Sequence, residues 1–387
     1  MSFPNRPRAL FLLPLLVGAC QSSNDAQSFA DPQEPAAIEV KPQDASPIPG
    51  GERCDDLIMP GEEKFISKLW KVTSGGENAE AYWSYDGSRL VMQSRRPADG
   101  IQCDQIFVTT PGGTELVSAG GVTTCSYFLP SDDKVLFAST HAADADCPPA
   151  PDRSQGYVWA LYPTYDVWQR DLKSGDLTPL ITGPGYDAEA TVSPRGDRMV
   201  FTSTRSGDIE LWTCALDGSD VKQVTDEIGY DGGAFFSHDG EKLVFRSTAF
   251  TPGKEEAEQA DYKRLLAQNL VRPSHMELYV CNADGSGRKQ ITRLGGANFA
   301  PFFTPDDKHI LFSSNHHDTN KPALNFDLFM VPVEGGDVVQ VTHYNESRGK
   351  QFDSFPMFSP NGKYLAFASN RGDGEAGETN VFVAEWR

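Results

Sequence analysis

Short polar residues recur along this sequence, each five positions before a large apolar residue that begins a repeated pattern. They are Asn78, Thr123, Asp187, Asp231, Asn298 and Asp353. A second set falls four positions after the end of the same pattern: Arg96, His141, Arg205, Ala249, His316 and Arg371. Carboxylates and amides facing cations could bind a polar or anionic ligand, or a hard cation such as calcium. The structural alternative is that Asp and Asn cap turns and pair with the arginines.

The histidines of the second set suggest a transition-metal site. His141 and His316 belong to the second and fifth copies of the pattern, which lie opposite each other in a ring of six. Metal ligands must come within about 2 Å of the ion, so these imidazoles meet only if both reach the ring axis. The candidate ligands are His141, His316, Asp187, Asp231 and Asp353. No other cofactor is expected.

The elements that position these residues are read from the repeated pattern itself. Its copies are WSYDGSRLVM (83–92), FLPSDDKVLF (128–137), VSPRGDRMVF (192–201), FSHDGEKLVF (236–245), FTPDDKHILF (303–312) and FSPNGKYLAF (358–367). Alternating apolar residues on both sides of an Asp/Gly-rich turn predict a β-hairpin. The copies are spaced 44 to 67 residues apart, and each except the last is followed by two further strand-like segments. Four strands at such a period indicate a propeller blade.

The last copy lacks a fourth strand, whereas an unpaired strand precedes the first copy. This segment, KFISKLWKVTSGG (64–76), shares its KVT with the KQVT and KQIT of complete copies. We therefore expect an all-β, six-bladed β-propeller of four-stranded antiparallel blades. An N-terminal strand would complete the last blade and close the ring, which removes the exposed sheet edges.

The repeat resembles the TolB-like (WD40-like, PD40) propeller repeat over roughly residues 63–387. This resemblance implies a binding role in the bacterial envelope, with contact to envelope proteins such as a peptidoglycan-associated lipoprotein. The chain departs from TolB in lacking its N-terminal α/β domain, which puts that partner in doubt. Propellers also serve hydrolases as gating domains, but no G-x-S-x-G, HExxH or P-loop motif occurs, so no catalytic residue is assigned.

All long insertions fall between the second and third strands of a blade, and therefore on one face of the ring. They span 140–163, 248–275, 315–325 and 370–378. Loops elaborated on one face of a rigid scaffold commonly bind ligands. Helical spacing over 255–270 places Tyr262, Leu265, Leu266 and Leu270 on one side. That helix either caps the channel mouth or packs on its rim.

The N-terminus has the features of an export signal. Arg6 and Arg8 precede a short apolar run, and Val17-Gly18-Ala19-Cys20 resembles a lipobox. This predicts a lipoprotein signal peptide over 1–19, lipidation of Cys20, and a flexible lipid-anchored tether over 20–62. The alternative is an ordinary signal peptide with an incidental cysteine. Both predict an exported protein, and lipidation would hold it on the periplasmic side or at the outer membrane.

Three further cysteines are candidates for a disulfide in an oxidising envelope: Cys103, Cys125 and Cys147. All three are expected on the elaborated face of neighbouring blades. The pairs Cys103–Cys147 and Cys103–Cys125 are both open from sequence.

Composition narrows the range of partners. The chain carries 34 Lys and Arg against 54 Asp and Glu, a formal charge of −20. Such a surface repels phosphate backbones, so nucleic acid is excluded as a partner, and membrane contact is expected only through the lipid anchor. We expect a non-catalytic envelope binding module that uses the elaborated face and the channel mouth to bind a protein or a polar ligand. The alternative is a metal-dependent polysaccharide lyase or hydrolase at the same mouth.

Overall fold

The computed structural model describes residues 46–387 except 155, 319–324, 344–351, 373 and 375–376. The described residues belong to one compact unit, Asp44–Arg387. The predicted signal peptide, Cys20 and most of the tether lie outside the described residues.

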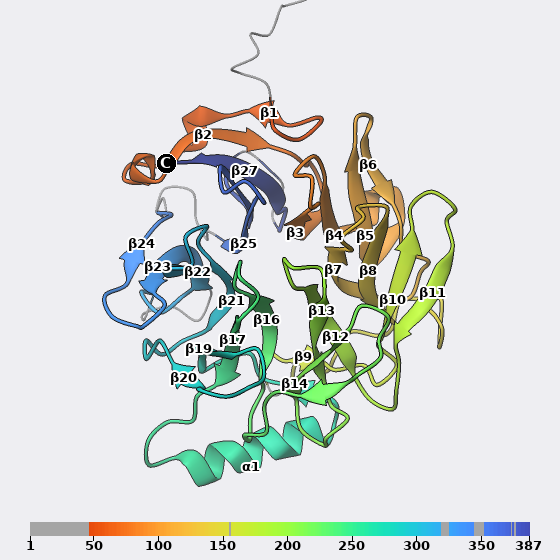
Figure 1. The fold of residues 1–387 in the computed structure, drawn as a ribbon, viewed down its shortest axis with the longest axis vertical. Coiled ribbons are helices and arrows are strands. Elements are labelled where there is room, and N and C mark those ends of the chain that lie inside the picture. Colours follow the sequence, from red (N-terminus) through yellow and green to blue (C-terminus); the bar gives the residue numbers. More distant parts are fainter. Residues whose placement is uncertain (1–45, 155, 319–324, 344–351, 373, 375–376) are drawn as a thin grey trace, which may run out of the picture. The chain divides into compact units, whose positions relative to one another are not determined.

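Six antiparallel sheets surround a central channel, which confirms the predicted six-bladed β-propeller (Figure 1). The strands of blades one to three are β3 (Glu77–Trp83), β4 (Leu90–Arg96), β5 (Ile101–Thr110) and β6 (Gly113–Leu116); β7 (Thr123–Phe128), β8 (Lys134–Ser139), β10 (Asp166–Asp171) and β11 (Leu177–Ile181); β12 (Asp187–Val192), β13 (Arg198–Ser203), β14 (Glu210–Ala215) and β15 (Lys222–Gln223). Those of blades four to six are β16 (Gly232–Phe236), β17 (Lys242–Thr248), β19 (Met276–Asn282) and β20 (Lys289–Gln290); β21 (Asn298–Phe303), β22 (His309–Ser314), β23 (Asp327–Pro332) and β24 (Val339–Gln340); β25 (Asp353–Phe358), β26 (Tyr364–Ser369) and β27 (Asn380–Trp386).

The turn of each repeated hairpin is held by its own side chains. In blade four, Ser237 Oγ donates to Asp239 Oδ1 at 2.6 Å and accepts from the Lys242 backbone N–H at 3.0 Å. Gly240 has a φ of +70° in this turn, a conformation that favours glycine. The same bond from Ser or Thr to an Asp or Asn two residues later occurs at this position in four of the six hairpins.

The ring is closed by β2 (Ile66–Lys71), which pairs antiparallel with β27 as the fourth strand of blade six. The shared KVT motif has a structural basis. Val72 N–H donates to Val381 O at 2.8 Å, and Thr73 Oγ1 accepts from Val381 N–H at 2.9 Å. In blade three, Val224 and Thr225 make the same two bonds to Leu211. The predicted ring closure is therefore confirmed.

The predicted tether needs a correction over residues 46–62, which are packed on blade six. The strand β1 (Glu52–Arg53) adds a fifth strand beyond β2, and Ile48 is fully buried in the main core. Glu62 is also buried, where it pairs with Arg371. The segment folds because its few apolar residues cover the outer edge that β2 would otherwise expose.

The insertions of blades two and four meet on one face of the ring. Blade two contributes β9 (Trp159–Ala160), and blade four contributes α1 (Glu255–Leu266) followed by β18 (Leu270–Val271). The helix is shorter than predicted because Asn269 adopts a positive φ, which ends the helical segment before Leu270. Tyr262 and Leu265 are buried against the rim.

Candidate functional site

The first ring predicted from the repeat, the six short polar residues, lies inside the blades. Each of these side chains is at most 1% exposed. In five of the six blades, the residue of this ring pairs across the first hairpin with a Ser at or near the end of the second strand. In blade five, for example, Ser314 Oγ donates to Asn298 Oδ1 at 2.6 Å.

The predicted cations complete this arrangement. Arg205 Nη2 lies 2.8 Å from Asp187 Oδ1, and Arg371 Nη2 lies 2.8 Å from Asp353 Oδ2. In blade one, Arg96 Nε donates to Ser94 Oγ at 2.8 Å. The predicted arginines therefore bond within their own blades, to a carboxylate in blades three and six and to a serine in blade one.

Blade four has Ala249 at the cationic position and obtains its cation from elsewhere. Arg288, from the turn before β20, places Nη1 2.6 Å from Asp231 Oδ2. Burial raises the pKa of Asp231, while Arg288 opposes that rise. An arginine from a different position therefore fills the same structural role.

The two histidines contact neighbours in their own blades. His141 Nδ1 lies 2.9 Å from Ser139 Oγ with its ring against Trp168, and His316 Nδ1 lies 2.8 Å from Ser314 Oγ with its ring against Phe329. Burial lowers the pKa of both imidazoles. Over the described part of the chain, no three His, Cys, Asp or Glu side chains are grouped so as to hold a metal ion.

Of the twelve residues in the two predicted sets, only Thr123 lines the cavity inside the ring. That cavity, of about 800 Å³, is surrounded by a second ring two residues further along the innermost strands. Its members, all with φ between 50° and 60°, are Glu80, Cys125, Glu189, Gly233, Ala300 and Phe355. We call this set the bulge ring, and the six residues of the preceding paragraphs the buried ring.

A β-bulge in every innermost strand creates the bulge ring. The register of each first hairpin shifts at this point, for example between Ala79 and Tyr82 in blade one. A bulge re-aims a side chain, and positive φ at a non-glycine residue costs on the order of 1 kcal/mol. This ring was not predicted from the sequence, because the alternation of apolar and polar residues along a strand does not reveal a register shift. The available signal was the same sixfold spacing, offset by two.

The cavity is closed on the hairpin side by aromatic rings two residues beyond the bulge ring. Tyr82 of blade one and Phe235 of blade four, on opposite sides of the axis, have ring centroids 5.7 Å apart. Tyr127 contacts both, and Phe302 packs against Phe235 at 5.2 Å. These rings form an apolar floor.

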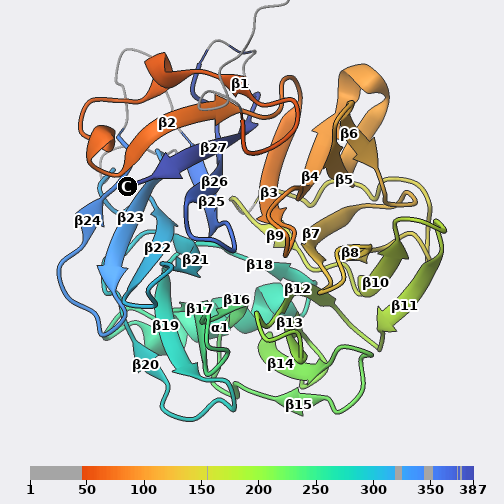
Figure 2. The ribbon, with the colours of Figure 1, turned by 45° about the horizontal axis from the view of Figure 1, so that its top comes forward.

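On the other face, a two-stranded ribbon covers the cavity. In it β9 pairs with β18, so that Trp159 lies opposite Val271 and Ala160 opposite Leu270 (Figure 2). A disulfide between Cys103 and Cys147 ties the blade-two insertion to β5 of blade one. The structure thus selects one of the two cysteine pairs left open by the sequence, and Cys125 is a free thiol.

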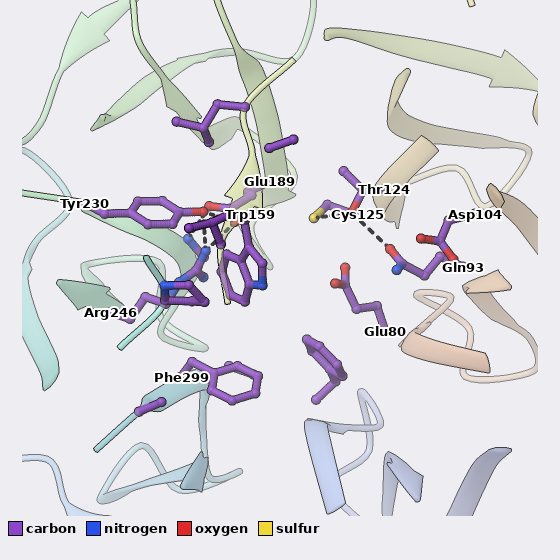
Figure 3. A pocket seen from close by; sticks show the side chains of 18 of the residues that line it. Glu80, Gln93, Asp104, Thr124, Cys125, Trp159, Glu189, Tyr230, Arg246 and Phe299 are labelled. Carbon is purple, nitrogen blue, oxygen red and sulfur yellow. Dashed lines mark hydrogen bonds and ion pairs between the residues drawn. The ribbon is translucent and has the colours of Figure 1, made fainter. Parts of the chain in front are cut away.

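One wall of the cavity carries an ion-paired cluster, in which Arg246 Nε is buried without a hydrogen-bond partner among the described residues. Glu189 forms an ion pair with Arg246 and accepts hydrogen bonds from Tyr230 Oη at 2.7 Å and Thr202 Oγ1 at 2.7 Å (Figure 3). Burial alone would raise the pKa of Glu189, but Arg246 holds it below its usual value. A Cβ at Gly233 would lie 1.8 Å from Arg246 Nη1, so glycine in blade four admits this arginine.

The opposite wall carries carboxyl groups with less support. Glu80 extends toward the cavity beside Cys125, facing the Glu189 wall across Trp159 (Figure 3). Its Oε2 is buried and meets no hydrogen-bond partner among the described residues. Burial raises the pKa of Glu80 to about 7 and that of Asp104 to about 6. Proximity to Glu189 and Asp104 adds to the rise for Glu80.

Comparison with known proteins agrees with this architecture. No protein-family model matches the chain, and no curated protein does. Among solved structures, TolB from Acinetobacter baumannii superposes with a TM-score of 0.51 at 18% identity. This chain has the TolB-type propeller fold. The match covers 79% of this chain and 66% of that TolB, just under two thirds of its length.

Other solved structures are similar at lower scores. A putative TolB from Agrobacterium tumefaciens has a TM-score of 0.48 at 14% identity, covering 81% of this chain and 91% of its own. An oligogalacturonate lyase from Vibrio parahaemolyticus has a TM-score of 0.47 at 10% identity, covering 87% and 96%. At these identities the TolB-type likeness is one of fold. Within its described residues, the chain has no helix of the length and apolar character of a membrane span.

Proposed function

We propose that this protein is a non-catalytic binding module of the bacterial envelope and that its ligand site is the covered channel. The single observation that carries the proposal is the cavity of about 800 Å³ inside the ring. Largely apolar concave sites with a few convergent polar groups are where proteins usually bind small ligands. The bulge ring supplies such polar groups. Its positive-φ backbone costs free energy that packing of the blades alone does not require.

Support for the envelope location comes from two sources. The sequence around Cys20 resembles a lipobox, and the fold is that of TolB proteins. The proposal includes lipid anchoring at Cys20 and contact between the elaborated face and an envelope protein, such as a peptidoglycan-associated lipoprotein. An affinity capture from envelope extract with the full chain tests this part. Its control is a variant in which the pairing of β9 with β18 is disrupted. The proposal is contradicted if the native chain enriches no envelope protein over that control.

The ligand site is tested by filling it. Ala300→Phe places at the blade-five position the residue that blade six already carries at Phe355, with the same backbone conformation. The full chain would be screened by thermal shift against small cationic, neutral and anionic compounds. We expect hits whose stabilisation is lost in Ala300→Phe and kept in Lys363→Phe, an exposed position in a hairpin turn.

Two results would contradict the proposal. One is hits that are unaffected by Ala300→Phe, with Cys125→Met as a second filling variant if Ala300→Phe melts early. The other is turnover of a polysaccharide by the purified chain that depends on a stoichiometric metal, measured together with metal analysis of wild type and a His141→Ala/His316→Ala variant. That outcome would favour the lyase or hydrolase alternative.

A further inference from the structure

We propose that the covered channel binds an organic ammonium ion, an amine on an apolar body, with Glu80 as its counter-ion. This inference rests on the proposed function, because it assigns a ligand class to the same cavity. It is drawn from the contacts of Glu80, the pairing of the other charges, and the aromatic walls.

Glu80 has no ion-pair partner among the described residues, and hydrogen bonding to the Cys125 thiol only partly offsets the effect of burial on its pKa. Its buried Oε2 has no hydrogen-bond partner among the described residues, although the strained backbone of the bulge directs the side chain into the cavity. A buried carboxylate without a partner costs free energy, and it is stabilised either by taking up a proton or by gaining a cation. A cationic ligand would supply that missing partner.

Two of the three arginines that line the cavity have carboxylate partners. Arg246 forms an ion pair with Glu189 and donates a hydrogen bond to Tyr230. Arg272 forms an ion pair with Asp261 at 3.4 Å. The guanidinium of Arg153 lies over the ring of Tyr157 at 5.2 Å. An anionic ligand would have to compete for these cations, whereas a cation meets Glu80 directly. The half-buried carboxyl of Asp104 adds negative potential on the same wall.

The walls beside Glu80 suit an organic cation better than a bare metal ion. Tyr82, Tyr165 and Trp159 line the cavity there, and their ring faces attract ammonium groups. Metal ions need several oxygen or nitrogen ligands, and no suitable group of three exists among the described residues. The wall of blades five and six is largely apolar, with Ala300 and Phe355 in the bulge ring and Phe299 beside them. It would receive the apolar body of the ligand.

Protonation of Glu80 gives the inference a second signature. A cation binds the ionised carboxylate, so affinity should rise as pH increases through the pKa of Glu80, about 7. The groups that act on Glu80 are Cys125, Glu189, Arg246 and Asp104. Asp104 titrates in the same sense at lower pH, whereas paired Glu189 stays ionised.

The test uses the full chain and three probes of similar shape: benzylammonium, benzyl alcohol and benzoate. Calorimetric titration at pH 8 should show benzylammonium binding at least about tenfold more tightly than the other two. Glu80→Gln, which keeps the side-chain shape, should weaken benzylammonium by about tenfold to a hundredfold and flatten its pH dependence between 6 and 8. The matched control is Glu77→Gln, an exposed carboxylate on the same strand, expected to change affinity by less than about twofold.

The outcomes separate the ligand class from the site. The ammonium assignment would be overturned if the three probes bind wild type and Glu80→Gln with equal affinity. If Ala300→Phe still abolishes that binding, the channel remains the ligand site. Probe binding that Ala300→Phe leaves unchanged, or no binding by any probe, would overturn the ammonium assignment; together with a screen lacking channel-dependent hits, it would overturn the proposed function as well.

Discussion

The buried ring and the bulge ring lie on the same six strands, two residues apart, in opposite environments. Members of the buried ring vary little: two Asn, one Thr and three Asp, each buried inside its blade. Members of the bulge ring differ in size and charge from blade to blade, and all face the cavity. The difference shows that chemical uniformity in a repeat reflects a shared structural contact. Under the proposed function, variation at a repeated position indicates where the copies differ in their contacts with a ligand.

The bulge ring itself consists of two chemically different halves. Blades one to three contribute Glu80, Cys125 and Glu189, whereas blades four to six contribute Gly233, Ala300 and Phe355. A ring of sixfold backbone symmetry thus carries a polar half and an apolar half. An amphipathic ligand would have one preferred orientation in it.

The largest effect is expected from breaking the buried ring in blade six. Arg371→Leu removes the partner of both Glu62 and Asp353, which are fully buried. Leaving buried charges uncompensated should lower the free energy of unfolding by about 3–5 kcal/mol. Chemical denaturation of the full chain measures this. Arg95→Leu, which breaks an exposed ion pair with Glu77, should cost less than about 1 kcal/mol, and equal losses would contradict the structural role of the ring.

A smaller effect is expected within one strand, where the two rings can be compared directly. Asn298→Ala removes a side chain that donates to Met276 O at 2.8 Å and accepts from Ser314 Oγ at 2.6 Å. Loss of these buried bonds should cost about 1–3 kcal/mol. Ala300→Ser, two residues on, should shift stability by less than about 0.5 kcal/mol because its side chain faces the cavity. Similar losses for both would remove the distinction between the rings.

A third effect has the opposite sign. Because the pKa of Glu80 is raised to about 7, the folded protein holds this proton more tightly than the unfolded chain. Glu80 therefore destabilises the fold as pH rises from about 5 to 8, with the full penalty above its folded pKa. Glu80→Gln should remove that pH-dependent loss and melt higher than wild type at pH 8. Thermal melts of the ligand-free wild type and variant at pH 5 and 8 measure this effect. A Glu80→Gln variant that melts at a lower temperature than wild type at pH 8 would contradict it.

The smallest effect is expected at Cys125. Its thiol is free, lines the cavity, and has a pKa raised well above the usual value by burial and by the charges of Glu80 and Glu189. Cys125→Ser should change stability by less than about 0.5 kcal/mol, since the position faces the cavity. The native thiol should react with iodoacetamide far more slowly than in urea. Rapid modification of the native protein at pH 8 would show that the Cys125 thiol is ionised or that this wall of the cavity is open.

Much of the scaffold could be predicted from the sequence because its signals are local. Hairpin alternation, turn residues and the KVT motif sufficed for six blades and their closure by β2. The buried ring was also found by spacing. Of its arginine partners, Arg205 and Arg371 were predicted, while Arg288 was not, because it reaches Asp231 from a turn outside the repeated position.

The site itself depends on features that no local signal carries. A bulge changes which side chain faces the channel without changing the apolar pattern around it, so Glu80 and Glu189 were missed. The ribbon pairs Trp159 with Val271, in insertions of different blades that only the closed ring brings together. The packing of residues 46–62 on blade six likewise depends on an edge that exists only after closure.

The ribbon has a consequence for the time course of binding. Since β9 and β18 lie over the cavity, exchange of a bound molecule is expected to wait for their separation. Two short strands with few backbone bonds open often compared with blade strands, in the manner of local unfolding. Strengthening their pairing would slow association and dissociation together while the equilibrium constant stays nearly unchanged. The residence time of a ligand would then be set by the two insertions, and its affinity by the ring beneath them.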